Sequence, residues 1–332
     1  MAKRTGNGNA VDHSAVFPIA PGAMKLLSIL TSLTVSALAA DSFTAPAAAG
    51  ADYAIQGEYA GEGSGAQVIA LGDGKFRVVG WDGGLPGSAE NVERKAEITG
   101  ELKDGKVVFK DAEWDAVLEN GGIIGKKGEH TYTLKKTERK SPTVGAKPPA
   151  GALVLFDGTN ADAWKNGKVG EDGFLSMGVV SKQAFGDCTL HVEFRTPFMP
   201  KASGQGRGNS GVYLQNRYEV QVLDSFGLKG ENNEAGGIYT KHKPRVNMAF
   251  PPLTWQTYDI DFTAAKWDAD GKKTANARIT VKHNGVLVQD NVEIDKETTA
   301  AGMKDGPGPG PIQLQNHGNP VAYRNIWLVE KK

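Results

Sequence analysis

Short runs in which apolar and polar residues alternate recur along most of the chain. In residues 188–195 (CTLHVEFR) every second side chain is apolar, and residues 217–224 (RYEVQVLD) repeat the pattern. Alternation with a period of two places one set of side chains on one face of a β-strand and the other set on the opposite face. After the N-terminal 40 residues, no stretch of ten or more residues has the period of a helix. The pattern predicts an all-β protein.

Three tight turns are marked by Asp-Gly or Asn-Gly pairs between such runs. They are expected at Gly72–Gly74, at Asp104–Gly105 and at Asn284–Gly285. These pairs favour the two-residue turns of β-hairpins, because Asp, Asn and Gly tolerate the positive φ angles that those turns require. Each pair therefore predicts two antiparallel neighbours in a sheet.

Two stretches rich in small residues and proline divide the chain. Residues 44–51 carry no periodic pattern and are predicted to be a linker, and residues 141–151 are predicted to be a second, semi-rigid Pro-rich linker. We therefore expect a small all-β domain at 52–140 and a larger β-domain at 152–332. Strands with one apolar and one polar face indicate a β-sandwich, in which the polar face of one sheet is a candidate binding surface.

Residues 1–40 are predicted to be a leader that contains a secretory signal peptide. Lys25 precedes an apolar run over residues 26–38, and Ala37-Leu38-Ala39 has the small–x–small pattern of a cleavage site. Met24 is the expected start of this signal. The apolar run is shorter than the ~20 residues of a membrane span. We expect an exported protein, periplasmic or extracellular, with no membrane span after signal removal.

Composition narrows the functional classes. The chain has 332 residues, with 38 Lys and Arg against 38 Asp and Glu, so its formal net charge is zero. A nucleic-acid partner is not expected, because proteins that bind nucleic acids usually carry a basic excess. Cys188 is the single cysteine, which excludes an intramolecular disulfide and a zinc site built on paired cysteines. Cys188 lies on the apolar face of its strand and is expected to be a buried packing residue.

Two motif matches are better explained as turns and loops. Gly206, Gly208 and Gly211 fit the dinucleotide-binding spacing G-x-G-x-x-G, but the residues that follow alternate like a strand, whereas that motif requires a helix. Residues 268–271 (DADG) begin like a calcium loop and lack its later ligands, so they predict a turn. Neither motif predicts a cofactor.

The candidate chemistry consists of polar residues on strands and adjoining loops. Carboxylate, amide, guanidinium and imidazole groups on one sheet face can hydrogen-bond sugar hydroxyls and transfer protons. A solvated strand face is the alternative reading for each residue taken alone. The residues concerned are Glu193 and Arg195, Asn209, Glu219, Gln221 and Asp224, and Gln315 and His317.

Six blocks in the second half of the chain resemble the 3-keto-disaccharide hydrolase family of exported bacterial proteins. The resemblance covers residues 152–330. The blocks occur in order at residues 154–164, 185–197, 208–227, 236–262, 281–285 and 310–328, among them GNSGVYLQNRYEVQVLDSFG and GPIQLQNHGNPVAYRNIWL. The resemblance implies a concanavalin A-like lectin/glucanase jelly-roll sandwich and action on glycosides that are oxidised at C3 of a sugar ring.

One departure from the family pattern affects a candidate residue. The family usually has Asp before the final His, whereas Asn316 precedes His317 in this chain. If that Asp orients the imidazole, Asn316 favours a different tautomer or weakens His317 as a base.

Cleavage of a 3-keto-glycoside requires a base for the C2 proton, a positive group at the enolate oxygen and an acid for the leaving oxygen. Glu219 and His317 are the candidates for proton transfer, and Arg195 or a bound divalent cation is the candidate for the enolate. No ligand spacing identifies a metal ion or another cofactor. The candidates for positioning the sugar hydroxyls are Glu193, Asn209, Gln221, Asp224, Tyr239, Lys241 and Gln315.

Two other functions use the same fold or the same residue types. A non-catalytic carbohydrate-binding module would rely on stacking aromatic residues and would need no perturbed acid or base. A conventional glycosidase would use two carboxylates at a fixed separation, for which Glu193 and Glu219 are candidates. The sequence identifies neither the sugar nor the aglycone, and it does not distinguish elimination from direct hydrolysis.

We predict that the exported protein lacks residues 1–39, because the small–x–small site follows an apolar run of signal length. N-terminal sequencing of the exported protein tests this. A chain that begins at Met1 or Met24 contradicts it.

Overall fold

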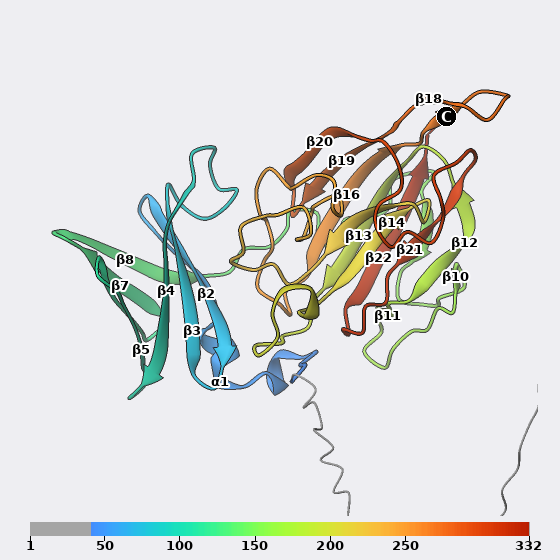
Figure 1. Cartoon of the computed structure of the whole chain (residues 1–332). Coiled ribbons are helices and arrows are strands. Elements are labelled where there is room, and N and C mark those ends of the chain that lie inside the picture. The colour runs from blue at the N-terminus through green and yellow to red at the C-terminus, as the bar shows by residue number, and fades with distance from the viewer. Residues whose placement is uncertain (1–40, 332) are drawn as a thin grey trace, which may run out of the picture. The chain divides into compact units, whose positions relative to one another are not determined.

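A computed structural model of the protein describes residues 41–331, and the predicted leader lies outside these residues. The first part is a closed antiparallel barrel of eight strands in chain order, completed by pairing of β1 with β8 (Figure 1). The strands are β1 (Gly57–Gly61), β2 (Ser64–Gly72), β3 (Lys75–Asp82), β4 (Glu93–Lys103), β5 (Lys106–Lys110), β6 (Trp114–Glu119), β7 (Gly122–Lys127) and β8 (His130–Thr137).

The second part is a sandwich of two antiparallel sheets, of the jelly-roll type that the sequence predicts. The smaller sheet has five strands in the order β10 (Trp164–Lys165), β12 (Val179–Phe185), β21 (Gly310–Leu314), β14 (Ser210–Leu214) and β15 (Tyr218–Val222). The larger sheet has β11 (Leu175–Ser176), β22 (Ala322–Glu330), β13 (Cys188–Arg195), β16 (Gln256–Thr263), β19 (Ala277–His283) and β20 (Val286–Ile294), and β9 (Leu153–Phe156) pairs with β22. A two-stranded ribbon joins β17 (Lys266–Trp267) to β18 (Lys273–Ala275).

The sandwich core lies between the two sheets and uses the apolar face that the alternation predicts. Leu190 and Phe194 of β13 meet Val220, Val222 and other side chains of the smaller sheet in one buried cluster. Cys188 belongs to this cluster, and its burial raises the pKa of its thiol to about 12. It is therefore a packing residue, as expected.

The three predicted hairpins are all present. Asp73, Asp104 and Asn284 each have a φ angle near +50°, and the glycine that follows each of them also has a positive φ. These turns join β2 to β3, β4 to β5 and β19 to β20. Residues 268–271 form a turn, as predicted. Gly211 lies in strand β14 and not at the start of a helix, so the glycine spacing at 206–211 is not a dinucleotide-binding motif.

Two segments differ from the linkers that the sequence predicts. Residues 44–51 contain the 3₁₀ turn η1 (Pro46–Ala48) and the start of helix α1 (Gly50–Ile55). The first half of the second linker, residues 141–146, is bonded to the outer face of the larger sheet. Thr143 Oγ1 donates to Asp259 at 2.7 Å, and Gly145 N donates to Glu193 at 2.5 Å. Side chains of the larger sheet thus form hydrogen bonds with the backbone of residues 141–146. Such contacts between distant parts of the chain cannot be predicted from the sequence of the segment itself.

Another short 3₁₀ turn, η2 (Gly204–Gly206), precedes β14. Within residues 41–331, no helix combines the length and the apolar character that crossing a membrane requires.

Candidate functional site

A row of large polar side chains crosses the outer face of the smaller sheet. Strand register places Gln313 of β21 beside Tyr213 of β14, and Tyr213 beside Glu219 of β15. Tyr239, in the segment after β15, lies next to Glu219 in the same row. Its backbone N–H donates to the carbonyl of Glu219, as in a neighbouring strand. Their strand neighbours Val212, Val220 and Leu314 face the core. Alternation within each strand therefore turns the row away from the core.

Glu219 is a buried carboxyl, and no cationic side chain within residues 41–331 is bonded to it. Its side chain is 1% exposed, and Tyr213 Oη donates to its Oε2 at 2.7 Å. Burial raises the pKa of Glu219 to about 8, although the hydrogen bond from Tyr213 acts in the opposite direction. At neutral pH the carboxyl is therefore mostly protonated, and it can donate a proton.

Gly211 provides the space that this carboxyl occupies. A Cβ atom added at Gly211 would overlap Oε1 of Glu219 and would lie 2.9 Å from its carboxyl carbon. Residue 211 pairs with Gln221 on β15, so the Glu219 side chain folds across the neighbouring strand. Neither Gly211 nor Tyr213 was among the candidate residues. The alternation in residues 211–215 (GVYLQ) places both on the polar face of the strand. They were not predicted as site residues, because glycine and tyrosine in a strand are more often packing residues.

The Gln221 amide can respond to the charge of Glu219. In one orientation its nitrogen donates to Gln205 at 3.0 Å, which leaves its oxygen 3.0 Å from Glu219 Oε1. That oxygen accepts a hydrogen bond if Glu219 is protonated. In the reversed orientation the amide nitrogen of Gln221 donates to Glu219 Oε1. An ionised Glu219, which can only accept hydrogen bonds, requires this orientation. Asn209 lies at the same place and donates to the Gln205 carbonyl at 2.8 Å.

The segment after β21 carries two further candidates, of which Gln315 contacts the row. Gln315 donates to Tyr213 Oη at 3.0 Å, so Tyr213 bridges Gln315 and Glu219. His317 follows two residues later and is exposed. Asn316 accepts a hydrogen bond from the backbone N–H of Gly318 at 2.9 Å. Asn316 thus holds the turn beside His317.

The structure does not bring Glu193 or Arg195 to this site, which corrects the expectation of one shared polar face. Both are on β13 of the larger sheet, and their strand neighbours Val192 and Phe194 face the common core. They therefore lie on the opposite outer face of the sandwich from Glu219. Because packed sheets are ~10 Å apart and both side chains point outward, Glu193 and Glu219 cannot act as a glycosidase pair.

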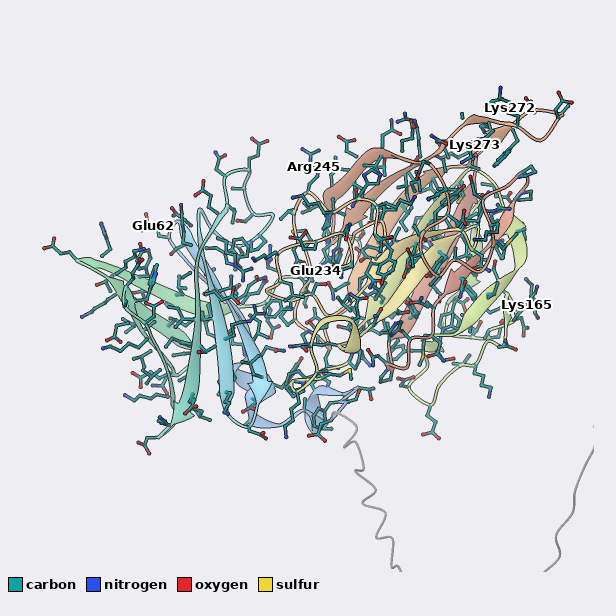
Figure 2. All side chains as sticks on the ribbon, viewed as in Figure 1. Glu62, Lys165, Glu234, Arg245, Lys272 and Lys273 are labelled. Carbon is teal, nitrogen blue, oxygen red and sulfur yellow. The ribbon has the colours of Figure 1, made fainter. Side chains whose placement is uncertain are left out.

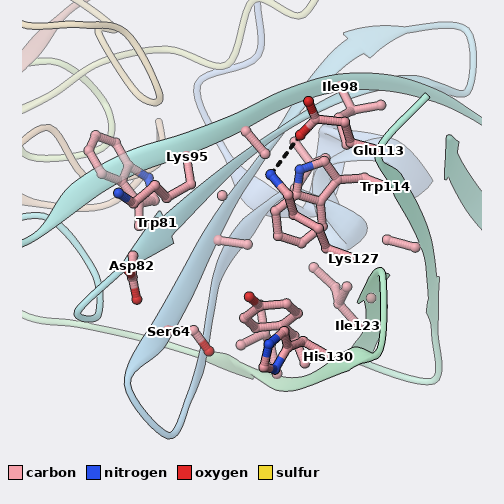
Figure 3. A pocket seen from close by; sticks show the side chains of 18 of the residues that line it. Ser64, Trp81, Asp82, Lys95, Ile98, Glu113, Trp114, Ile123, Lys127 and His130 are labelled. Atoms are coloured by element: carbon pink, nitrogen blue, oxygen red, sulfur yellow. Dashed lines mark hydrogen bonds and ion pairs between the residues drawn. The ribbon is translucent and has the colours of Figure 1, made fainter. Parts of the chain in front are cut away.

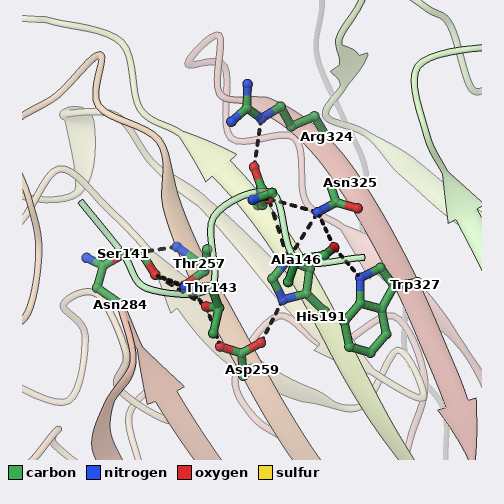
Figure 4. A network of polar contacts seen from close by, with 12 residues as sticks. Ser141, Thr143, Ala146, His191, Thr257, Asp259, Asn284, Arg324, Asn325 and Trp327 are labelled. Carbon is green, nitrogen blue, oxygen red and sulfur yellow. Dashed lines mark hydrogen bonds and ion pairs between the residues drawn. The ribbon is translucent and has the colours of Figure 1, made fainter. Parts of the chain in front are cut away.

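Glu193 belongs instead to a buried polar network on the larger sheet. Figure 4 shows this network, with His191, Arg324 and Asn325 labelled. Arg324 and Asn325 donate to its carboxylate at 2.7 and 2.8 Å, and His191 lies 3.6 Å away. Burial alone would raise the pKa of Glu193, but these donors outweigh it and hold the pKa at about 2. The carboxylate is a structural anion that fixes residues 141–146.

Arg195 packs between aromatic rings rather than beside Glu219. Its guanidinium carbon lies 5.0 Å from the ring centres of both Phe174 and Trp255, and it donates to the carbonyl of Thr44 at 3.0 Å. These cation–π contacts account for its position on the sheet. Arg195 is therefore not placed to stabilise an enolate at the Glu219 row.

Asp224 and Lys241 are each held in an ion pair. Asp224 is buried and accepts from Arg207 Nε at 2.6 Å. Lys241 donates to Asp295 at 2.5 Å. The ion pair with Arg207 fixes the Asp224 carboxylate, and its role as a sugar-binding residue stays a prediction. The role of Lys241 likewise stays a prediction.

No group of three or more His, Cys, Asp and Glu side chains within residues 41–331 is placed to hold one metal ion. The row contains one carboxyl, two tyrosines and several amides. This donor set suits a sugar ring better than a divalent cation, which prefers several carboxylates or imidazoles.

The sandwich and its row of hydrogen-bonding side chains define a carbohydrate-active β-protein. Residues 151–329 match the model of the 3-keto-alpha-glucoside-1,2-lyase-like domain. The chain belongs to this family, and the resemblance that the sequence indicated over residues 152–330 is confirmed. A comparison with curated proteins returned no match.

One solved structure agrees with this assignment. A "putative glycosyl hydrolase" from Parabacteroides distasonis ATCC 8503 is 37% identical, with a TM-score of 0.50, over 55% of this chain and 85% of that one. A second protein of the same description and organism is 19% identical, with a TM-score of 0.38, over 55% of this chain and 94% of that one. Both alignments extend over little more than half of this chain.

We predict that Glu219 makes stability depend on pH. The unfolded chain loses this proton near the ordinary value of 4.5, whereas the folded protein holds it until about pH 8. The folded state thus binds more protons between these values, and the free energy of unfolding falls as the pH rises from about 4.5 to about 8. Urea titrations of Glu219→Gln should lack this part of the decline. An identical pH dependence in the variant contradicts the shifted pKa.

Proposed function

We propose that the chain is an enzyme that cleaves 3-keto-glycosides, including 3-keto-disaccharides, by elimination across C1 and C2 of the oxidised sugar. The observation that carries the proposal is a neutral, buried carboxyl, Glu219, on the polar face of a domain of the 3-keto-alpha-glucoside-1,2-lyase-like family. A lectin has no need for such a group, because binding requires no proton transfer. The predicted leader further supports the proposal that the enzyme acts outside the cytoplasm.

The chemistry follows from the ketone at C3. The ketone acidifies the proton on C2, and a base that removes this proton forms an enolate. Collapse of the enolate breaks the bond between C1 and the glycosidic oxygen, and an acid protonates that oxygen as it leaves. The products are an enone and a free alcohol. Addition of water to the enone then gives the free 3-keto sugar. The two steps together amount to hydrolysis of the glycosidic bond.

Glu219 is suited to the acid step. Its carboxyl carries a proton up to about pH 8, and Tyr213 and Gln221 fix its two oxygens. An acid held ready at neutral pH protonates a leaving alkoxide without waiting for solvent. His317, exposed just beyond the same sheet, is the candidate base for the C2 proton.

The amides of the row would hold the sugar. Gln315 and Asn209 come from strand ends that flank Glu219, and Tyr239 extends the row on the other side. Gln313 Oε1 is buried and has no donor among the described residues. An unpaired acceptor of this kind favours a ligand that carries hydroxyl donors. In this arrangement side-chain N–H groups, rather than Arg195, would stabilise the enolate oxygen.

Replacement of Glu219 by Gln should lower turnover of a 3-keto-glycoside by ~100-fold or more, the usual scale for loss of a general acid. Release of the aglycone measures this. Glu231→Gln is the matched control, because Glu231 is an exposed carboxylate of the same sandwich, and it should keep wild-type turnover. His317→Ala should also lose activity while folding normally. Near-normal turnover by Glu219→Gln, or equal activity on the unoxidised parent glycoside, contradicts the proposal.

Gly211→Ala should lower activity without unfolding the protein, because the new Cβ displaces the Glu219 carboxyl from its position. Gly206→Ala is its control in the same glycine-rich segment, since no atom lies within 4 Å of a Cβ built there and its φ is not positive. The comparison is of kcat for the two variants at equal thermal stability. Equal kcat values would show that the position of Glu219 over Gly211 does not matter for the reaction.

A further inference from the structure

The eight-stranded barrel encloses a cavity of about 680 Å³ (Figure 3). Its walls come only from barrel residues, so it is separate from the Glu219 row. Small-molecule sites commonly have volumes of ~300–1,000 Å³, and barrels of eight strands can hold one small ligand.

The cavity exists because strand register gathers the smallest side chains at one level of the barrel. Ala66 of β2 pairs with Gly80 of β3, and Gly80 pairs with Ala96 of β4. Across the barrel, Ala116 of β6 pairs with Gly125 of β7. Larger residues at these positions would fill the space.

Large side chains of the barrel core lie next to these small residues and limit the cavity, which we call the cup. Phe76, Phe109 and Leu118 are large side chains buried in the barrel core. Phe109 pairs directly with Ala116, and Leu118 is the next inward-facing residue of the same strand as Ala116. Tyr53 and Ile55, from helix α1, pack against the same core. The small residues therefore create one confined space and do not hollow the whole barrel.

The wall of the cup is aromatic and its mouth is electrically balanced. Trp114 and Tyr132 pack with their ring centres 5.3 Å apart, and the ammonium of Lys127 lies 5.3 Å from the Trp114 ring centre. Lys127 is neutralised by Glu113, which accepts from it at 2.6 Å. His130 stands at the mouth beside these groups (Figure 3).

We propose that this cavity is a binding site for an uncharged, hydroxylated aromatic molecule of about two or three fused or linked rings. The alanine, isoleucine and aromatic walls favour a flat apolar body. The imidazole of His130 and the ion pair at the mouth offer hydrogen bonds to a hydroxyl group. The site and its ligand do not depend on the lyase activity proposed for the sandwich.

The same features disfavour two other ligand classes. A fatty acid or an aromatic sulfonate brings a negative charge, but Lys127 is already paired with Glu113, and Lys95 with Glu93. An oligosaccharide requires many hydrogen-bonding partners along its length. The polar side chains of the lining include Ser64, Asp82 and His130, but the level of Ala66, Gly80, Ala96, Ala116 and Gly125 between the walls offers a sugar no side-chain partner.

Isothermal titration calorimetry on the full chain tests the proposal with 2-naphthol as the probe. We expect one site with a Kd of roughly 100 µM or tighter, the range that a ligand of this size can reach. Naphthalene-2-sulfonate, decanoate and cellobiose should each bind at least ~10-fold more weakly, which is a difference of about 1.4 kcal/mol.

Ala116→Phe fills the cavity and should abolish naphthol binding. Its control is Ile124→Phe, which adds similar bulk on the adjacent strand, but at an outward position that is 53% exposed. If Ala116→Phe does not fold, Ala96→Leu provides a smaller filling on the other wall. Naphthol that binds equally to the filled and control variants overturns the site. Tighter binding of the sulfonate, decanoate or cellobiose overturns the ligand class, and no binding of any probe overturns both.

Discussion

The candidate site depends on one constraint, the burial of a carboxyl group without a positive partner among the residues that the structure describes. Removing Glu219 from water favours its neutral form, and its neighbours are ones that tolerate this form. Tyr213 donates to one oxygen, Gln221 can accept from or donate to the other, and Gly211 leaves room for both. A lysine or an arginine at any of these positions would ionise the carboxyl and remove its use as an acid. The site therefore requires a tyrosine at position 213, an amide at 221 and a glycine at 211. An ordinary solvent-exposed strand would tolerate many other residues at these positions.

The sandwich holds a second buried carboxyl in the opposite state. Glu193 is as buried as Glu219, but Arg324, Asn325 and His191 surround it, and its pKa is about 2. One fold thus keeps two glutamates at pKa values near 2 and near 8 by environment alone. The anionic one bonds to the backbone of residues 141–146 and stabilises the structure. The neutral one is buried on the outer face of the smaller sheet, within the row of amides that we propose to bind the sugar.

The sequence predicted local features well and their assembly less well. The hairpin at Asn284, the apolar face that contains Cys188 and the polar position of Glu219 all follow from neighbours along the chain. The sheet that each strand joins does not, because it depends on contacts between distant residues. Glu193 and Glu219 both lie on polar strand faces, yet β13 and β15 belong to different sheets, so those faces point in opposite directions. The barrel cavity could not be predicted for the same reason. It depends on the pairing of strands that places Ala66, Gly80 and Ala96 side by side.

The protonation of Glu219 can be measured directly. The carboxyl ¹³C resonance of Glu219, assigned in the glutamate-labelled protein by its absence from Glu219→Gln, can be followed by NMR from pH 4 to pH 10. The account predicts a titration midpoint near pH 8. A midpoint near 4.5, the ordinary value for glutamate, would mean that the carboxyl is ionised at neutral pH and cannot serve as the acid of the reaction.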